Sequence, residues 1–328
     1  MMNFKQYDNV TKIVIPNNVT LSNTSFYAAF QGMKNLTTSE FNHPSVTNMS
    51  YMYYSCYNFN SPPVCGENVT DMSYAYGYCN NMAGSPVCGN KVTNMYYTYD
   101  NCKTLTGAPV CGSNVVGMVG AYRNCYNMTG APVCGSNVNT MSYTYYNCTN
   151  LTGSPACGSK VESLAYAYYN CQNLTGNPVC GSKVTNMVNA YVNCKKLTGS
   201  PVCGANVTTM VNAYRNCQNL TGLPVSGNKV TNMYYAYYNC KKLTAGTVYW
   251  WNANMTSVRS CFALKNNSRR INIHVPDAST TLTKCLINNT QSIVGANITW
   301  TEKSDADITW YYNAAYNIYI YANADMMP

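Results

Sequence analysis

The chain has 328 residues, of which 46% are hydrophobic and only 9% are charged, and its formal net charge is +9. With 32 tyrosines, the surface is expected to consist mostly of neutral hydroxyl and amide groups, which suit contact with sugars or proteins. The 20 lysines and arginines form no single block, so the composition does not favour nucleic-acid binding, and solvated lysines along repeat edges explain the charge more simply.

Residues 1–45 are predicted to form an N-terminal cap. Val10–Pro16 alternates as a strand does, and Phe26–Leu36 is a degenerate copy of the repeat that follows. A cap is needed because an exposed apolar end would invite end-to-end association. The first residues contain no apolar run of signal-peptide length, and no stretch reaches the roughly 18 apolar residues of a membrane span.

Residues 46–252 consist of nine copies of a 23-residue phrase, without insertion or deletion. The first cysteine of each copy recurs from Cys56 to Cys240, and the apolar slots vary only among apolar residues. One copy cannot bury its own hydrophobic side, so the copies are predicted to stack as coils of a solenoid. We expect the core ladder to include Cys102, Cys125, Cys148, Cys171, Leu105, Leu151, Leu174, Met95, Met118 and Met141.

Each copy divides into two parts. Leu105–Val110 is predicted to be a short strand, because Pro109 is excluded from helix interiors, and stacked copies would form a narrow parallel sheet. Val92–Cys102 brings Met95, Tyr99 and Cys102 onto one side at i, i+4 and i+7, which favours a short helix or 3₁₀ turn on the opposite face. Asparagine ladders, such as the one through Asn101, are expected to serve the turns between these faces, and Gly112 is expected to permit a tight corner.

The phrase Cys-x-x-Leu, followed by the valines and by Met-x-x-Ala-Tyr, resembles the leucine-rich repeats of the BspA type. The resemblance runs from about Phe26 to Leu264 and implies a leucine-rich-repeat-like solenoid in a surface protein. The chain departs from that family in three respects. It has Tyr where Phe is usual, Pro-Val-Cys-Gly in place of an Ile-x-Ile-Pro strand, and few charges.

Residues 253–328 are predicted to hold one more degenerate repeat and a β-rich C-terminal cap or assembly module. Four segments alternate like strands: Ile271–Pro276, Ser292–Val294, Asn297–Trp300 and Asn317–Tyr321. The last of them is aromatic enough either to pack over the final coil or to join a neighbouring subunit, so a homo-oligomer through this module is one hypothesis.

The sequence contains little that indicates catalysis. Most of the 18 cysteines occupy two repeat slots, which favours free, buried thiols over disulfides and singles out no nucleophile. No Cys-x-x-Cys pair exists and the only histidines are His43 and His274, so no metal is expected. Glu302, Asp305 and Asp307 are most simply a turn. We therefore expect neither enzyme activity nor a cofactor.

The candidate binding face is formed by tyrosines of two repeat slots, because tyrosine offers flat amphipathic area. An equally open alternative is that one of these rows is half-buried between coils. The ten candidates are Tyr51, Tyr74, Tyr97, Tyr143, Tyr166 and Tyr235 in one slot and Tyr54, Tyr146, Tyr169 and Tyr238 in the other.

Three function classes follow. The leading hypothesis is a non-catalytic bacteriophage virion component (surface, fibre or decoration), made in the host cytoplasm and contacting other virion proteins and a host glycan or protein. The alternative is a BspA-like adhesin of the bacterial cell surface. The third is an enzyme or nucleic-acid-binding protein that acts through the C-terminal module.

Overall fold

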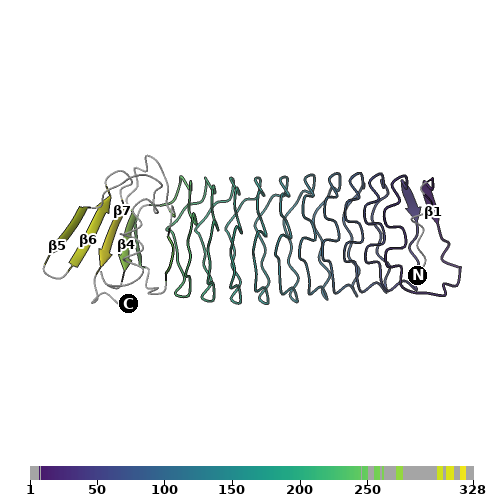
Figure 1. Ribbon diagram of the computed structural model, residues 1–328, viewed down its shortest axis with the longest axis horizontal. Coiled ribbons are helices and arrows are strands. Elements are labelled where there is room, and N and C mark those ends of the chain that lie inside the picture. The colour runs from purple at the N-terminus through teal and green to yellow at the C-terminus, as the bar shows by residue number, and fades with distance from the viewer. Residues whose placement is uncertain are drawn as a thin grey trace. The chain divides into compact units, whose positions relative to one another are not determined.

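The computed structural model forms two compact units, Met1–Leu174 and Thr175–Pro328, and each contains 23-residue coils stacked side by side (Figure 1). The predicted solenoid is therefore confirmed. The division falls inside the predicted repeat segment, so the proposed boundaries at residues 1–45, 46–252 and 253–328 stay predictions. The structure describes residues 7, 9–244, 246–249, 255–258, 261, 271–275, 301–305, 308–313 and 318–322.

The first unit begins with a two-stranded parallel sheet. Strand β1 (Lys12–Val14), which lies within the predicted Val10–Pro16 strand, pairs with β2 (Thr38–Glu40). The degenerate copy after β1 has Phe26, Phe30, Met33 and Leu36 buried. At the predicted N-terminal cap, the structure therefore has a strand that pairs with the end of a degenerate copy of the repeat.

Main-chain hydrogen bonds along one side of the coil join neighbouring coils. In the coil that starts at Val92, alternate amides donate to the next coil: Met95 to Gly117, Tyr97 to Val119, Tyr99 to Ala121 and Asn101 to Arg123, at 2.8–2.9 Å. The intervening amides of Thr98, Asp100 and Cys102 donate to the carbonyl three residues earlier. One set of amides therefore joins neighbouring coils, and the amides between them close β-turns within the coil.

This segment is a run of β-turns, where a helix or 3₁₀ turn was expected. Tyr97 and Asn101 have φ of 51° and 61°, in the left-handed region that a continuing right-handed helix excludes. Asn101 suits that region, as the asparagine pattern predicted. Single parallel bridges connect the coils at the residue before the methionine. They run from Ser25↔Asn48 to Thr140↔Ser163 in the first unit and from Asn186↔Thr209 to Asn232↔Ser257 in the second.

The segment predicted to form strands, Leu105–Val110, does not form a strand. Its Gly107 has φ of 81°, and Pro109 has no N–H to donate to a ladder. Thr106 donates to the carbonyl of Gly84 in the preceding coil at 2.9 Å. The backbone of Val110 needs other partners.

A buried tyrosine supplies those partners. The hydroxyl of Tyr122 accepts a hydrogen bond from the amide of Val110 at 3.1 Å and donates to the carbonyl of the same residue at 2.5 Å. Tyr99 bonds Val87 in the same way, at 3.0 and 2.7 Å. The second unit repeats the arrangement in Tyr214 with Val202, at 3.1 and 2.7 Å. Each such bond pair crosses the interior of a coil.

In each unit these tyrosines form a fully buried column, and we call the columns the interior tyrosine ladder. Rings of successive coils are nearly parallel, with centroids 5.3–5.6 Å apart in the first unit and 5.4–5.6 Å apart in the second. Its members are Tyr53, Tyr76, Tyr99, Tyr122, Tyr145 and Tyr168 in the first unit and Tyr191, Tyr214 and Tyr237 in the second. Sequence reasoning placed Tyr99 inward but gave its hydroxyl no role.

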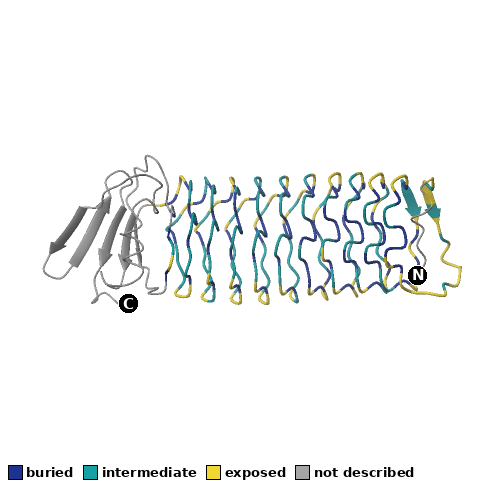
Figure 2. Cartoon of the chain, in the orientation of Figure 1, coloured by how far each residue is buried: buried dark blue, intermediate teal, exposed yellow. Residues whose placement is uncertain are grey.

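The predicted core residues surround this ladder. All ten that were named, from Met95 to Leu174, have no exposed surface. The buried cysteines also donate Sγ–H bonds to the preceding coil: Cys125 to the carbonyl of Tyr99 at 3.0 Å, and Cys148 to that of Tyr122 at 2.9 Å. Figure 2 shows the buried segments along the coils, with the exposed residues at the turns.

The glycine after the second cysteine serves close packing, where a tight corner was expected. Gly112 does not have positive φ, but a Cβ there would lie 2.9 Å from the carbonyl oxygen of Gly89. Successive coils thus approach at a point that has no room for a side chain. The left-handed corner is at Gly107 instead.

The second unit also contains a mixed five-stranded sheet in the order β3-β4-β7-β6-β5, parallel from β3 to β7 and antiparallel from β7 to β5. Two predicted strands match β4 and β7, whereas Ser292–Val294 and Asn297–Trp300 lie outside the described residues. The strands are β3 (Gly246–Tyr249), β4 (Ile271–Val275), β5 (Thr301–Asp305), β6 (Ile308–Asn313) and β7 (Ile318–Ala322).

We expect Tyr122→Phe to lower the free energy of unfolding by about 1–3 kcal/mol. The substitution removes the hydroxyl that bonds both the amide and the carbonyl of Val110. Denaturant unfolding followed by circular dichroism measures the change. The control is Tyr96→Phe, since Tyr96 is 38% exposed, and it should change stability by less than about 0.5 kcal/mol. Equal effects of the two variants would contradict the assignment.

Candidate functional site

The ten tyrosines of the candidate binding face lie on the turn segment and are all half-buried. The first slot, which includes Tyr97 and Tyr143, has φ between 51° and 58°. Tyrosine rarely adopts this conformation, which costs roughly 1–2 kcal/mol per residue. Glycine and asparagine fill the same slot at Gly120, Asn189 and Asn212 without that cost. The tyrosines therefore stand where a smaller residue would suit the backbone better.

Stacking between coils offsets part of this strain. Tyr51 lies 4.6 Å from Tyr74, Tyr74 lies 5.0 Å from Tyr97, and Tyr143 lies 4.6 Å from Tyr166, with interplanar angles of 7–15°. In the second slot Tyr146 and Tyr169 stack at 4.7 Å. Each such aromatic pair contributes about 0.5–1.5 kcal/mol beyond its buried area. The structure brings the two slots together as neighbouring stacks in the first unit.

An ion pair occupies two successive positions of the second slot in the first unit. Arg123 donates from Nε and Nη2 to the two carboxylate oxygens of Asp100, both at 2.8 Å, and its guanidinium lies 5.1 Å over the ring of Tyr97. The Asp100 side chain is 1% exposed and that of Arg123 is 30% exposed. The hydrogen bonds to Asp100 raise the pKa of Arg123. The pair replaces aromatic residues of the second slot, and sequence reasoning missed it although both positions break the slot pattern.

The second unit presents a different arrangement in the same slots. Arg215 lies 5.2 Å over Tyr235 and 5.5 Å over Tyr238. These two rings meet edge to face at 5.0 Å, so they do not continue a stack. Asn189 and Asn212 take the preceding positions of the first slot. The ten predicted residues therefore form stacks in one unit and an arginine-centred cluster in the other.

The lysines of one repeat slot are held by asparagines. Lys91 and Lys160 donate from Nζ to Asn68 and Asn137 of the preceding coil, at 2.5 and 2.7 Å, and Lys229 donates to Asn206 at 2.8 Å. All three lysines are exposed. This geometry is typical of a solvent-exposed edge of the coils and does not indicate a nucleic-acid-binding site.

No cysteine in the described part of the chain is set apart from the others as a catalytic nucleophile. Its 17 cysteines are free, as the slot pattern predicted. Burial raises the pKa of the Cys88, Cys134 and Cys203 thiols to about 12, so they are neutral near pH 7. A thiolate nucleophile needs the opposite shift.

The remaining candidate residues are the histidines and the acidic residues of the C-terminal segment. Among the described residues no group of three or more His, Cys, Asp or Glu could hold a metal ion, and no helix is long and apolar enough to cross a membrane. His43 is buried and its Nε2 lies 2.8 Å from the carbonyl of Val19. Glu302 and Asp305 lie in strand β5, so their assignment to a turn was wrong, and Asp307 lies outside the described residues.

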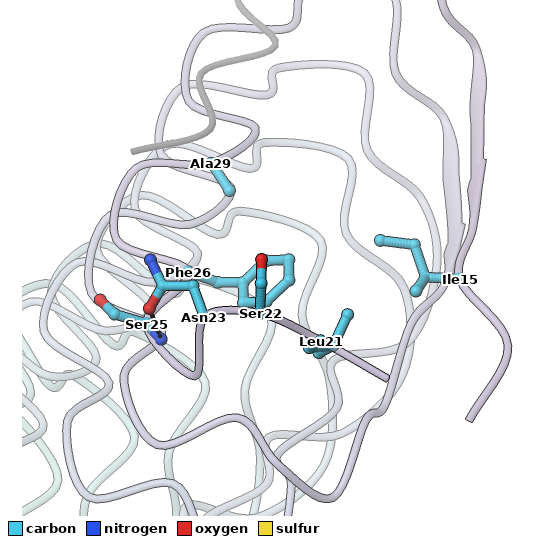
Figure 3. Close-up of a pocket in the computed structure, with 7 residues that line it drawn as sticks. All are labelled: Ile15, Leu21, Ser22, Asn23, Ser25, Phe26 and Ala29. Carbon is cyan, nitrogen blue, oxygen red and sulfur yellow. Dashed lines mark hydrogen bonds between the residues drawn. The ribbon is translucent and has the colours of Figure 1, made fainter. Parts of the chain in front are cut away.

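One cavity at the start of the chain lies beside the degenerate repeat. It has a volume of about 180 Å³ and is lined by Ile15, Leu21 and Phe26 together with three small polar residues and Ala29 (Figure 3). No charged side chain lines it. It is a packing gap beside β1 and offers no catalytic groups.

The structure is thus a repeat protein whose most distinctive surface feature is the two slots of tyrosines on the turn segment. The chain belongs to the family described as Mycoplasma protein of unknown function, DUF285, whose model matches residues 24–110 and 162–274, more than half of the chain. No curated protein matches it.

Two solved structures are similar in fold, and both are leucine-rich repeat proteins, the class that the repeat resembles. A leucine-rich repeat protein from Bacteroides ovatus is 13% identical, with a TM-score of 0.38, and the match covers 81% of this chain and 88% of that one. A leucine rich cell surface protein from Faecalibacterium prausnitzii is 11% identical, with a TM-score of 0.41, and the match covers 88% and 91%. Both likenesses are distant.

We expect Asp100→Ala to lower the free energy of unfolding by roughly 3 kcal/mol, because it leaves the partly buried Arg123 without its carboxylate. The matched control is Glu40→Ala in the exposed Lys12–Glu40 pair, which should cost less than about 1 kcal/mol. Urea unfolding compares the two variants. Similar losses would show that the Asp100 pair is no more than a surface contact.

Stability should fall at alkaline pH. Burial raises the pKa of thiols such as Cys88 to about 12, and that of phenols such as Tyr99 well above 10. The protonated forms stabilise the fold fully below the unfolded thiol pKa of about 8.5, and this contribution is lost as the pH rises towards 12. We expect Tm to be level between pH 7 and 8 and to fall steadily above pH 9. A level Tm up to pH 11 would contradict the buried thiols.

Proposed function

We propose that the chain is a non-catalytic repeat protein of the bacterial cell surface, which presents its tyrosine face to a glycan or a protein. The single observation that supports this most is the pair of tyrosine stacks on the turn segment. Stacked rings at 4.6–5.0 Å form a flat amphipathic surface with little conformational entropy left to lose on binding.

The strain in the first slot supports the same proposal. A backbone that favours glycine or asparagine carries tyrosine at Tyr51, Tyr74, Tyr97, Tyr143 and Tyr166 in the first unit. Strained residues of this kind cluster at sites that use them. The fold itself does not require the aromatic ring, because Gly120 occupies the same slot with the coil intact.

The cell surface replaces the virion as the main hypothesis. The resemblance of the repeat to BspA-type surface proteins leads to this class, and the Faecalibacterium structure is itself described as a cell surface protein. The virion role, the C-terminal assembly contact and a function hidden in the C-terminal sheet stay untested predictions.

Surface location is tested on intact cells of the native host. An antibody raised against the chain should label unlysed cells, and external protease should remove the labelling. A cytoplasmic protein of the same cells serves as the control that must stay intact. Labelling that appears only after lysis would refute the proposal, and recovery of the chain in purified virus particles would favour the virion.

Binding by the tyrosine face is tested on a glycan and protein array. Replacing both Tyr143 and Tyr166 by Ser removes one stack and should weaken binding by roughly tenfold or more, since each aromatic contact contributes about 0.5–1.5 kcal/mol and tenfold in affinity corresponds to about 1.4 kcal/mol. Tyr7→Ser is the control, because Tyr7 is 51% exposed and lies in neither slot. Unchanged binding by the double variant would exclude this stack as the contact surface.

A further inference from the structure

Arg215 and Arg123 occupy the same repeat slot, four repeats apart, and the structure gives them opposite surroundings. They are the two arginines in the described part of the chain. Because the coils repeat without insertion, the neighbours of one can be compared slot by slot with the neighbours of the other. The comparison identifies what Arg215 lacks.

Arg123 receives its carboxylate from the preceding coil. Asp100 accepts hydrogen bonds from Nε and Nη2, each at 2.8 Å, in the side-on geometry that guanidinium and carboxylate prefer. The guanidinium lies over Tyr97 of that same coil. The repeat thereby builds one complete carboxylate site from its own residues.

At Arg215 the slot of Asp100 is taken by Val192, which is 4% exposed and cannot accept a hydrogen bond. The slot of Tyr97 is taken by Asn189. Arg215 turns to the following coil and lies over Tyr235 and Tyr238, at 5.2 and 5.5 Å. Its Nε is buried without a hydrogen-bond partner, and no carboxylate of the described residues lies within 4.0 Å of its guanidinium.

A second unsatisfied atom lies one turn earlier on the same coil. Asn212 has φ of 53° in the slot of Tyr97, and its Oδ1 is also buried without a partner. An unsatisfied buried donor or acceptor costs about 1–3 kcal/mol, so such groups call for a partner from outside. A ligand that satisfies both must offer a carboxylate to the guanidinium and an N–H or O–H donor to the amide oxygen.

Hydroxylated carboxylic acids of this kind are the acidic sugars. Their apolar C–H faces suit the rings of Tyr235 and Tyr238, which are half-buried and flank the guanidinium. A carboxylate alone would satisfy Arg215 but carries no donor for Asn212, whereas a uronic acid carries its carboxylate and its hydroxyl donors on one ring. The combination of groups therefore favours a saccharide.

We propose that Arg215, Asn212, Tyr235 and Tyr238 bind the carboxylate-bearing residue of an acidic saccharide, such as a uronic acid. The inference rests on the proposed surface function, for which it names the ligand class and the residues. The ligand carboxylate does for Arg215 what Asp100 does for Arg123.

The experiment is calorimetric titration of the full chain with tri-galacturonate and with its fully methyl-esterified form. The ester keeps every ring hydroxyl and removes the charge. We expect the acid to bind at least about tenfold more tightly than the ester, since charge-assisted hydrogen bonds contribute about twice as much as neutral ones. Arg215→Lys keeps the charge but loses the planar fork, and it should weaken binding of the acid by a similar factor.

The decisive variant is Val192→Asp, which supplies Arg215 with the carboxylate that Asp100 gives Arg123. It should abolish binding of the acid while leaving Tm unchanged or higher. Val192→Asn introduces a side chain of the same size as Asp but without the charge, and this variant should still bind the acid. Val116→Asp adds the same charge at a valine that is 42% exposed and should have no effect.

The outcomes separate this inference from the proposed function. Equal affinity for acid and ester, or unchanged binding by Val192→Asp with Tm maintained, would overturn the Arg215 site and leave a tyrosine-face surface protein standing. Binding of an acidic peptide in place of tri-galacturonate, lost in Val192→Asp, would overturn the saccharide. A chain absent from the cell surface would overturn the proposed function while the titration still reports on Arg215.

Discussion

The hydrogen bonds between an interior tyrosine hydroxyl and the backbone of the residue twelve positions before it, a valine in most coils and Ala156 before Tyr168, are the interaction on which the rest of the coil depends. One side of the coil is held by main-chain bonds to its neighbours, whereas the proline side cannot form such a ladder. Tyr122 satisfies both backbone groups of Val110 from inside the coil. The proline segment is therefore fixed, across the interior, to the turn segment that follows it in the chain.

The departures of this repeat from the BspA pattern follow from that interaction. Phenylalanine in the place of Tyr122 would fill the interior equally well but would leave the backbone of Val110 without partners. A sheet-forming Ile-x-Ile segment needs no such help, because its amides pair with the next coil. Tyrosine inside and Pro-Val outside are thus two halves of one solution. Cysteine adds a weak thiol bond to the tyrosine carbonyl of the preceding coil.

Much of this could be predicted from the sequence, because an unbroken 23-residue period fixes which side chains lie on the same side of every coil. Met95, Tyr99 and Cys102 were placed inward correctly, although the segment is a run of turns. The conformation could not be predicted, since a period of three to four residues is shared by helices and by successive turns, and the left-handed Tyr97 contradicts its own propensity.

The candidate site was predictable only in its aromatic part. Repetition identified the tyrosine slots, but the functional interest of Arg215 arises from what its neighbours lack, Val192 where Asp100 stands elsewhere. Such a difference has meaning only once the slots are known to be adjacent in space.

The most direct test of the central claim is amide hydrogen exchange of the native chain, resolved at the valines of the proline segment. If the interior tyrosines hold these amides, Val87, Val110 and Val133 should exchange as slowly as the inter-coil amide of Tyr99. Exchange at the rate of an unprotected peptide, while Tyr99 stays protected, would contradict the account.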